Sequence, residues 1–214
     1  MSRAGIPPQG SLKTRKGKTL YFLAVAAVCC LWLAVNQAAR PPRGAYRGDT
    51  RCIFEGAALV DEKGEQRGCD DLEGKIVALY FAADWCPHCR SFTPSLRQLY
   101  GSSWSEDVRV VFVSSDMSAR DAESHYQSQK GGWFYLRHND PLTSELKKKH
   151  KVWSGREVKT FGKKRRSGVP TVLVIDESGN ELAFLDTERG GAASLFSFDP
   201  KAQIHHKWSD KSEL

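Results

Sequence analysis

Three largely apolar runs stand out in the hydrophobic pattern, at residues 76–82, 108–114 and 171–176. Short runs that are apolar throughout are typical of central strands with both faces buried. Residues 177–180 form a turn signal, and residues 181–186 then complete a hairpin with the third run. The pattern therefore predicts a sheet with a buried centre.

Helical spacing occurs between these strands. Phe92, Leu96 and Leu99 recur every three or four positions after the first strand, with Pro94 as an internal kink. An α/β domain at residues 51–200 follows from the alternation of strands and helices. Further helices are predicted at 119–130, ended by Gly131-Gly132, at 141–151, capped by Asp140 or Thr143, and at 195–198, with an aromatic stretch at 133–136.

Loose alternation at residues 52–60 predicts another strand, followed by a turn at residues 61–64. Cys52 and Cys69 flank this hairpin. If its strands pair, a disulfide between the two cysteines would contribute roughly 3 kcal/mol. Two reduced, partly buried thiols are the alternative.

The N-terminal region has a different pattern. Residues 1–18 are polar and basic, and we expect them to be disordered. Residues 20–35 carry no charge, and the segment 19–39 is just long enough to cross a bilayer core of about 30 Å. We predict an uncleaved signal anchor. A cleaved signal peptide fits less well, because Gln37-Ala38-Ala39 is a poor cleavage site, and flanking basic clusters are unusual for a buried soluble helix.

Charge separates this region from the domain. The formal net charge is +7, but residues 1–48 contain eight Lys or Arg and no acid, which leaves 24 bases against 25 acids in the remainder. The domain is close to neutral, so the pI does not indicate nucleic-acid binding. Lys and Arg residues are slightly more numerous before the uncharged run than directly after it, which favours an N-terminus in the cytosol with the domain across the membrane. Residues 40–50 read as a linker and residues 201–214 as a tail.

The candidate chemistry lies in residues 84–90, Asp-Trp-Cys-Pro-His-Cys-Arg. A strand that ends in Trp-Cys-x-x-Cys and turns into a helix is a redox signature. Cys86 would lie at the helix N-terminus, where unpaired N–H groups and the helix dipole stabilise a thiolate. Cys89 follows one turn later on the same face, within disulfide reach. We predict Cys86 as the nucleophile and Cys89 as the resolving thiol.

These residues resemble the thioredoxin superfamily, and within it the tryparedoxin and nucleoredoxin branch. The resemblance is carried by residues 78–94, by residues 111–116, by Trp133 and by the Ser-Gly-Val-Pro-Thr element at 167–171. It covers about residues 52–198. It implies a thioredoxin-like three-layer fold, in which helices flank a central mixed sheet.

The resemblance also implies a substrate-binding surface. In the family, the proline that matches Pro170 is cis and packs beside the cysteines. Pro170 would then hold the Val169 backbone and Thr171 against a bound thiol substrate, and Trp133 is assigned to the same surface.

Four features depart from the family pattern. Pro87-His88 replaces a Pro-Pro pair, Tyr80 stands where thioredoxins have a buried acid, and Gly131-Gly132 replaces Met-Pro. A Tyr at the Tyr80 position also occurs in the tryparedoxin branch. The fourth departure is the insertion at residues 153–166, with six bases and one acid. It is interpreted as a solvated surface loop or as a substrate-binding arm.

We predict that Trp85, Pro87 and His88 tune the reactivity of the two thiols. A protonated His88 would stabilise the Cys86 thiolate and hence the reduced form, which makes the pair more oxidising than a reducing thioredoxin. The alternative is an exposed His88 that tunes little. No cofactor or metal is predicted, because the remaining histidines show no ligand spacing that would complete a zinc site with the cysteines.

Three functions remain open. The preferred one is a thiol–disulfide oxidoreductase, tethered to a membrane by residues 19–39, that acts on protein thiols and disulfides. The second is a tryparedoxin-like carrier from a small dithiol, trypanothione, to peroxidases. That dithiol is cationic, and the basic insertion would repel it. The third is a redox-sensitive, membrane-tethered module that binds acidic partners.

The C-terminal residues 211–214, Lys-Ser-Glu-Leu, approximate an endoplasmic-reticulum retrieval signal. We therefore expect a lumenal domain on a single-pass anchor. A mitochondrial membrane is the alternative, because the acid-free N-terminus also suits that address.

Overall fold

The computed structural model describes residues 52–176 and 178–203. The predicted tail, anchor and linker at residues 1–50, and the C-terminal residues 204–214, lie outside the described residues. Within the described ranges, no helix is long and apolar enough to cross a bilayer. The described residues all belong to one of the two compact units of the chain, Asp49–Leu214.

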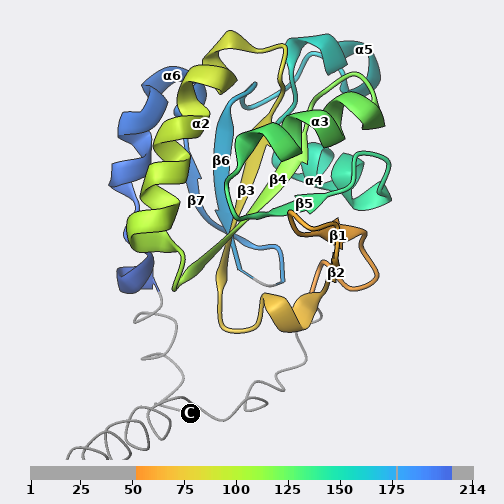
Figure 1. The fold of residues 1–214 in the computed structure, drawn as a ribbon. Helices are drawn as coiled ribbons and strands as arrows, with labels where there is room; N and C mark the ends of the chain where they lie inside the picture. The colour runs from red at the N-terminus through yellow and green to blue at the C-terminus, as the bar shows by residue number, and fades with distance from the viewer. Residues whose placement is uncertain (1–51, 177, 204–214) are drawn as a thin grey trace, which may run out of the picture. The chain divides into compact units, whose positions relative to one another are not determined.

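The described residues form a seven-stranded sheet in the order β2-β1-β5-β4-β3-β6-β7 (Figure 1). β3 runs parallel to β4 and antiparallel to β6, and β4 runs parallel to β5. β1 pairs antiparallel with β5. This mixed sheet confirms the predicted α/β class. The strands are β1 Leu59–Val60, β2 Gln66–Arg67, β3 Ile76–Ala82, β4 Val108–Ser114, β5 Phe134–Leu136, β6 Thr171–Ile175 and β7 Glu181–Leu185.

Helices cover both faces of the sheet, which gives the expected three layers (Figure 1). The units β3–α2–β4 and β4–α3–β5 are successive parallel crossovers in one direction. Because such crossovers are right-handed, α2 and α3 lie on the same face, and α4 lies behind the sheet (Figure 1). The helices are α2 Pro87–Leu99, α3 Ala119–Gln129, α4 Pro141–His150, α5 Val158–Phe161 and α6 Thr187–Gly190, with short turns η1 Cys69–Asp71, η2 Tyr100–Trp104, η3 Gly155–Glu157 and η4 Gly191–Ser197.

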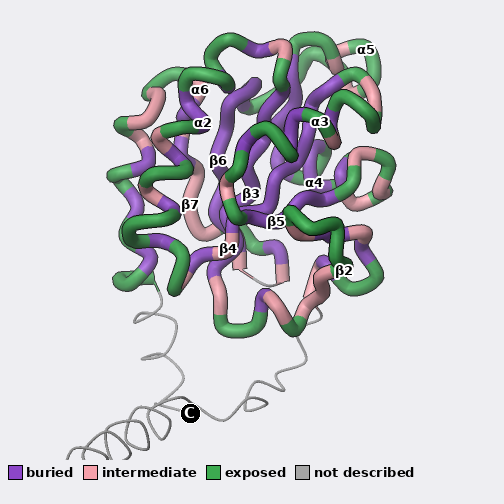
Figure 2. The backbone as a smooth tube through the Cα atoms, in the orientation of Figure 1, coloured by how far each residue is buried: buried purple, intermediate pink, exposed green. Residues whose placement is uncertain are grey.

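Burial is greatest in the middle of the sheet. All residues of β3 and β6 are buried, whereas β7 is mostly half-buried at the edge (Figure 2). The Tyr80 ring of β3 lies 5.7 Å from Phe92 of α2 and 6.1 Å from Phe112 of β4, between ring centroids. Burying a large apolar side chain contributes about 1.5–3 kcal/mol. This packing fixes the end of β3, from which the two cysteines follow.

Helix boundaries are set by local chemistry. Ser118 caps α3 by accepting the Asp121 amide, and Asp140 caps α4 by accepting the Leu142 amide. Asp140 is therefore the cap of α4, and Thr143 is not. Lys130, with a φ of 48°, ends α3 one residue before the predicted stop at Gly131.

Gly131 has another role. A Cβ atom there would lie 2.2 Å from the Trp133 ring, so the glycine lets that ring pack against the backbone. β5 consequently begins at Phe134, and Trp133 precedes it as a core residue.

The predicted strand at 52–60 is mostly wrong. Only Leu59 and Val60 are extended, because the preceding residues form turns closed by hydrogen bonds such as Glu55 N–H to Cys52 O. The hairpin itself is present, since β1 pairs antiparallel with β2. Cys52 and Cys69 form a disulfide across a separation of 17 residues. The disulfide alternative thus holds, but the bond joins a turn to η1 and does not flank two long strands.

Candidate active site

Cys86 and Cys89 lie at the N-terminus of α2 as free thiols. Cys86 is the N-cap residue, and its Sγ accepts the Cys89 backbone N–H at 3.4 Å. Cys86 is 6% exposed, whereas Cys89 is fully buried. An incoming sulfur can therefore reach Cys86 first, and Cys89 can act only from inside the protein.

Burial also separates the two thiols chemically. It raises the pKa of the Cys89 thiol far above its ordinary range, and the neighbouring Cys86 adds to this effect. Burial likewise raises the pKa of Tyr80, which stays neutral. The Tyr80 hydroxyl lies 2.8 Å from Thr93 Oγ1, which donates to the Cys89 carbonyl oxygen. Where thioredoxins have a buried acid, this chain therefore has a neutral hydroxyl that supports the backbone of Cys89.

The proline loop closes one side of the site. The Val169–Pro170 bond is cis, as the resemblance implied. Cys86 Sγ donates to the Val169 carbonyl oxygen at 3.5 Å, which places this backbone directly against the nucleophile. The loop is held from behind: Glu188 accepts the Gly168 amide at 2.5 Å, and Thr187 donates to the Pro170 carbonyl oxygen at 3.0 Å.

Three consecutive residues at the end of β4 hold the other side. The Asp84 amide donates to Asp116 Oδ1 at 2.8 Å, and the Trp85 indole N–H donates to the Ser115 carbonyl oxygen at 3.2 Å. The Lys147 ammonium donates to the Ser114 carbonyl oxygen at 2.6 Å. The loop that presents Cys86 is therefore fixed by backbone and side-chain bonds to the neighbouring strand.

Asp116 is the centre of a buried polar chain. The Trp133 indole donates to Gln129, Gln129 contacts His125 Nε2 at 3.0 Å, and His125 Nδ1 lies 2.9 Å from Asp116 Oδ2. Because Gln129 offers an N–H to Nε2, the His125 proton belongs on Nδ1, facing the carboxylate. Burial alone would raise the pKa of Asp116, but the bonds from His125, Ser114 and the Asp84 amide bring it below its ordinary value.

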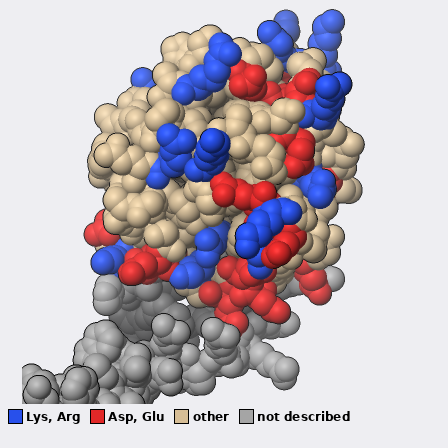
Figure 3. Space-filling view, viewed as in Figure 1, with Lys and Arg blue, Asp and Glu red and all other residues tan. Residues whose placement is uncertain are grey.

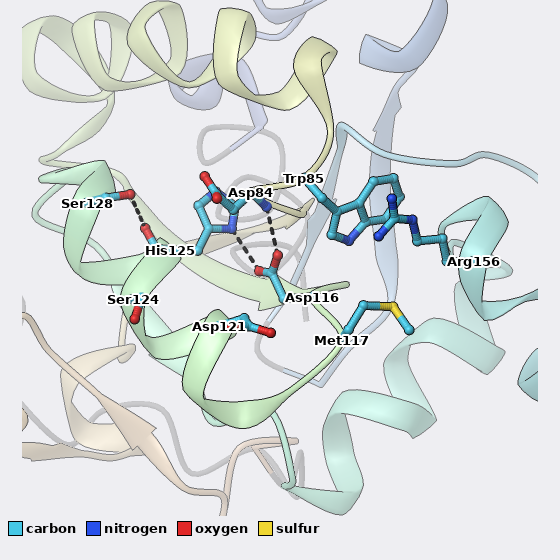
Figure 4. Close-up of a pocket in the computed structure, with 9 residues that line it drawn as sticks. All are labelled: Asp84, Trp85, Asp116, Met117, Asp121, Ser124, His125, Ser128 and Arg156. Atoms are coloured by element: carbon cyan, nitrogen blue, oxygen red, sulfur yellow. Dashed lines mark hydrogen bonds and ion pairs between the residues drawn. The ribbon is translucent and has the colours of Figure 1, made fainter.

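A groove of about 300 Å³ opens beside Trp85. Figure 4 shows Trp85, Met117 and Arg156 on one side of it and Asp121, Ser124 and His125 on the other, with Asp116 between them. Met117 is 62% exposed. The Arg156 guanidinium carbon lies 4.1 Å from the centre of the Trp85 ring. The groove thus begins at the residue directly before the nucleophile.

The insertion at 153–166 supplies Arg156, and its first half is packed. Trp153 is buried and donates from its indole to the Gly162 carbonyl oxygen at 3.0 Å. Glu157 pairs with the buried Lys147 ammonium and accepts the Ser154 amide. Burial lowers the pKa of Lys147, and Glu157 acts against this. The solvated-loop interpretation is therefore wrong for the buried Trp153 and Ser154 and for the half-buried Glu157 and Val158, whereas residues 155–156, 159–160 and 162–166 are exposed.

Comparison with known proteins shows the family to which this fold belongs. The family model described as thioredoxin-like matches residues 74–181. The chain belongs to the thioredoxin-like family. The chain is 37% identical over 146 residues to probable nucleoredoxin 1 of Arabidopsis thaliana, covering 65% of this chain and 22% of that protein. It is 33% identical over 123 residues to tryparedoxin of Trypanosoma brucei brucei, covering 56% of this chain and 74% of that one.

Among solved structures, thioredoxin from Wuchereria bancrofti matches with a TM-score of 0.55 at 26% identity, covering 75% of this chain and 99% of that one. These relatives support the predicted superfamily branch and the predicted class, a thiol–disulfide oxidoreductase. The match to nucleoredoxin 1 spans only about a fifth of that protein's length. Membership of the thioredoxin-like family fits a chemistry that needs no cofactor. Within the described ranges, no cluster of three His, Cys, Asp or Glu residues could hold a metal ion.

The structure brings most of the predicted site residues together. Cys86, Cys89, Trp85 and Val169 meet around the end of β3. His88 lies in the first turn of α2 with an exposed side chain, and its predicted effect on the thiolate stays a prediction.

Two predicted substrate-binding side chains lie elsewhere. Trp133 is fully buried, with its ring 6.1 Å from Tyr80, so it supports the core and does not line the surface. Thr171 is also fully buried, and its hydroxyl donates to the Gly168 carbonyl oxygen at 2.9 Å. Trp133 therefore supports the hydrogen-bonded chain that leads to Asp116, and Thr171 supports the proline loop.

Sequence reasoning missed Asp116, His125 and Arg156 as site residues. Asp116 could have been found, because the carboxyl ends of neighbouring parallel strands meet at one edge of a sheet, and β3 and β4 were both predicted. The helical spacing of α3 gives no sign that His125 faces Asp116. Arg156 needed the docking of the insertion, which depends on Lys147 of α4.

Proposed function

We propose that the chain is a thiol–disulfide oxidoreductase that acts on protein substrates through a mixed disulfide at Cys86. The observation that carries this proposal is the asymmetry of the two thiols. Cys86 reaches the surface between the Val169 backbone and Trp85, and Cys89 is enclosed one helical turn behind it. A nucleophile and a protected resolving thiol are what two-step disulfide exchange requires.

The reaction of the reduced protein has two balanced steps. The Cys86 thiolate attacks one sulfur of a substrate disulfide, that S–S bond breaks, and the other substrate sulfur leaves as a thiolate that takes a proton. Cys89 then loses its proton to solvent and attacks the Cys86 sulfur. The second substrate sulfur leaves as a thiolate, so the substrate is reduced by two electrons and the Cys86–Cys89 disulfide forms. The reverse sequence oxidises a dithiol substrate.

Trapping the intermediate tests the proposal. The 214-residue chain carrying Cys89→Ser is incubated with a peptide that contains one disulfide. We expect a stable adduct, visible by mass spectrometry as the sum of protein and peptide and released by dithiothreitol, because the substituted hydroxyl cannot attack the Cys86 sulfur. The double variant Cys86→Ser/Cys89→Ser is the matched control. An adduct of equal yield in the control would contradict the proposal.

The direction of the reaction is part of the proposal. We propose that Pro87-His88 makes the pair more oxidising than a reducing thioredoxin, because a protonated imidazole in the first turn of α2 favours the Cys86 thiolate. The disulfide between Cys52 and Cys69 fits an oxidising compartment.

We also propose that residues 19–39 tether the domain to a membrane, with the domain in the lumen of the endoplasmic reticulum. The uncharged run at 20–35 and the Lys-Ser-Glu-Leu terminus support this. A glycosylation acceptor placed near Leu214, before residues 211–214, tests the compartment. Its modification supports the lumen, whereas an unmodified protein that fractionates with mitochondria contradicts it.

A carrier role for a small cationic dithiol is a weaker proposal. Relatives named tryparedoxin favour it. Arg156 stacked on Trp85 argues against it, because a cationic ligand at Cys86 would meet this guanidinium.

A further inference from the structure

The groove beside Trp85 is lined by three carboxylates, those of Asp84, Asp116 and Asp121, and by one guanidinium, that of Arg156. Arg156 comes from the insertion and lies at the Trp85 end, while Asp121 lies at the opposite side (Figure 4). Asp121 accepts a hydrogen bond from Ser118 Oγ at 2.8 Å, as part of the cap of α3. Arg156 is the charged group that stacks on the ring of Trp85, the residue that precedes the nucleophile.

Arg156 is held in place from both directions. Its guanidinium lies over the Trp85 ring, and its chain neighbour Glu157 is fixed by the Lys147 ion pair and by the Ser154 amide and hydroxyl. Lys147 in turn donates to the Ser114 carbonyl oxygen on β4. The side chain is thus anchored to the same strand end that positions the loop of Cys86.

Stacking on an aromatic ring occupies the flat face of a guanidinium. The N–H groups point outward in the guanidinium plane, where they can bind a carboxylate through two hydrogen bonds. Arg156 is exposed and forms no ion pair with any carboxylate in the described part of the chain. The two other arginines of the insertion differ in this respect: Arg165 pairs with Glu188 at 3.6 Å and Arg166 with Glu181 at 2.8 Å. Figure 3 shows Lys and Arg gathered towards the α5 end of this face.

We propose that Arg156 is a specificity-determining residue that binds a carboxylate side chain adjacent to the reacting cysteine of a protein substrate. This inference rests on the proposed function and names its substrate class. The Trp85 ring and the exposed Met117 supply apolar contact for the peptide, and Arg156 selects an acidic neighbour over a basic one.

The test uses the reduced 214-residue chain and three synthetic peptides that share one disulfide. They differ only in the residue next to the attacked cysteine, which is Glu, Gln or Lys. The measured quantity is the second-order rate constant for oxidation of the Cys86–Cys89 dithiol. We expect the Glu peptide to react about tenfold faster than the Lys peptide, since one exposed charge contact changes a rate by up to about fivefold in each direction. High salt should reduce this ratio.

Two variants locate the selecting charge. Arg156→Gln should bring the Glu-to-Lys ratio to about two or less, the remainder being long-range attraction by other bases. Lys163→Gln removes the same charge from the exposed part of the insertion, outside the groove, and should keep the ratio within about twofold of the original.

The outcomes separate the two levels of the account. If the unmodified chain exchanges with none of the peptides, the proposed function fails. If it exchanges with all three at equal rates, the proposed function stands and the carboxylate site is wrong. A preference that survives Arg156→Gln, or that is lost equally in Lys163→Gln, also overturns the site. The site is also wrong if Arg156→Gln slows all three peptides equally, because Arg156 would then only support the Trp85 ring and would not select among substrates.

Discussion

The two cysteine pairs in the described part of the chain differ in spacing, burial and state. Cys52 and Cys69 are half-buried, separated by 17 positions and joined as a disulfide between a turn and η1. Cys86 and Cys89 are three positions apart, buried at a helix N-terminus and free. The first pair joins the turn at Cys52 to η1, whereas the second offers one reachable sulfur and one hidden sulfur. Surroundings, more than cysteine content, therefore separate a structural bond from a reactive one.

Removing the nucleophile gives the largest difference between the pairs. Cys86→Ser should abolish disulfide exchange, because no other described thiol reaches the surface between Trp85 and the Val169 backbone. The double variant Cys52→Ser/Cys69→Ser should retain the exchange rate. Both are checked with a peptide disulfide under identical conditions. If the Cys86→Ser protein kept its disulfide-exchange activity and the Cys52→Ser/Cys69→Ser protein lost it, Cys52 and Cys69 would be the reactive pair, and the assignment would be wrong.

The disulfide between Cys52 and Cys69 should contribute to the stability of the domain. Cys52→Ser/Cys69→Ser should lower the free energy of unfolding by about 3 kcal/mol, because the disulfide restricts the unfolded chain. For a domain of this size the melting temperature should fall by roughly 6–12 °C. Thermal unfolding followed by circular dichroism measures it. A shift no larger than that of Cys86→Ser would mean that the Cys52–Cys69 bond adds little beyond local packing.

The pH dependence sharpens the difference within the reactive pair. Burial keeps the pKa of Cys89 far above its ordinary value, so its thiolate fraction, and with it the rate of resolution, should rise about tenfold per pH unit across the neutral range. Mixed disulfides at Cys86 should consequently live longer at low pH. Rapid acid quenching and mass spectrometry measure their lifetime. A lifetime independent of pH would place proton loss from Cys89 outside the slow step.

The smallest effect is expected at His88. His88→Gln should lower the reduction potential by roughly 30 mV, a tenfold change in the equilibrium constant, because Gln cannot carry the positive charge with which an imidazole would stabilise the Cys86 thiolate and hence the reduced form. Equilibration with glutathione measures the shift. His138→Gln is a control for the loss of a histidine outside the first turn of α2, since the His138 ring hydrogen-bonds the Asp116 carbonyl oxygen. An unchanged potential in His88→Gln would show that the exposed imidazole tunes little.

Sequence pattern predicted the centre of the fold better than its edges. β3 and β4 match their apolar runs to the residue, because strands buried on both faces leave few polar positions to confuse the pattern. The strand at 52–60 failed because only Leu59 and Val60 find partners, in β2 and β5. Short edge strands depend on such tertiary pairing and carry little pattern of their own.

For the site, the sequence predicted the residues adjacent in the chain and missed those adjacent only in space. Cys86, Cys89 and Val169 came from local spacing and from resemblance. Trp133 was misplaced, because resemblance marks a position without stating its exposure. Arg156 was hidden in a segment whose docking depends on the buried Lys147–Glu157 pair, and no periodicity signals such a pair.

A redox titration of the 214-residue chain tests the central claim most directly. The protein is equilibrated across glutathione buffers, the thiols are alkylated, and each cysteine is assigned by mass spectrometry. The account predicts one two-electron transition between Cys86 and Cys89, at a potential above the value of about −270 mV typical of thioredoxin, while Cys52–Cys69 stays oxidised throughout. A potential at or below that value would contradict the proposed direction. A chain in which Cys86 and Cys89 form no reversible disulfide would contradict the function itself.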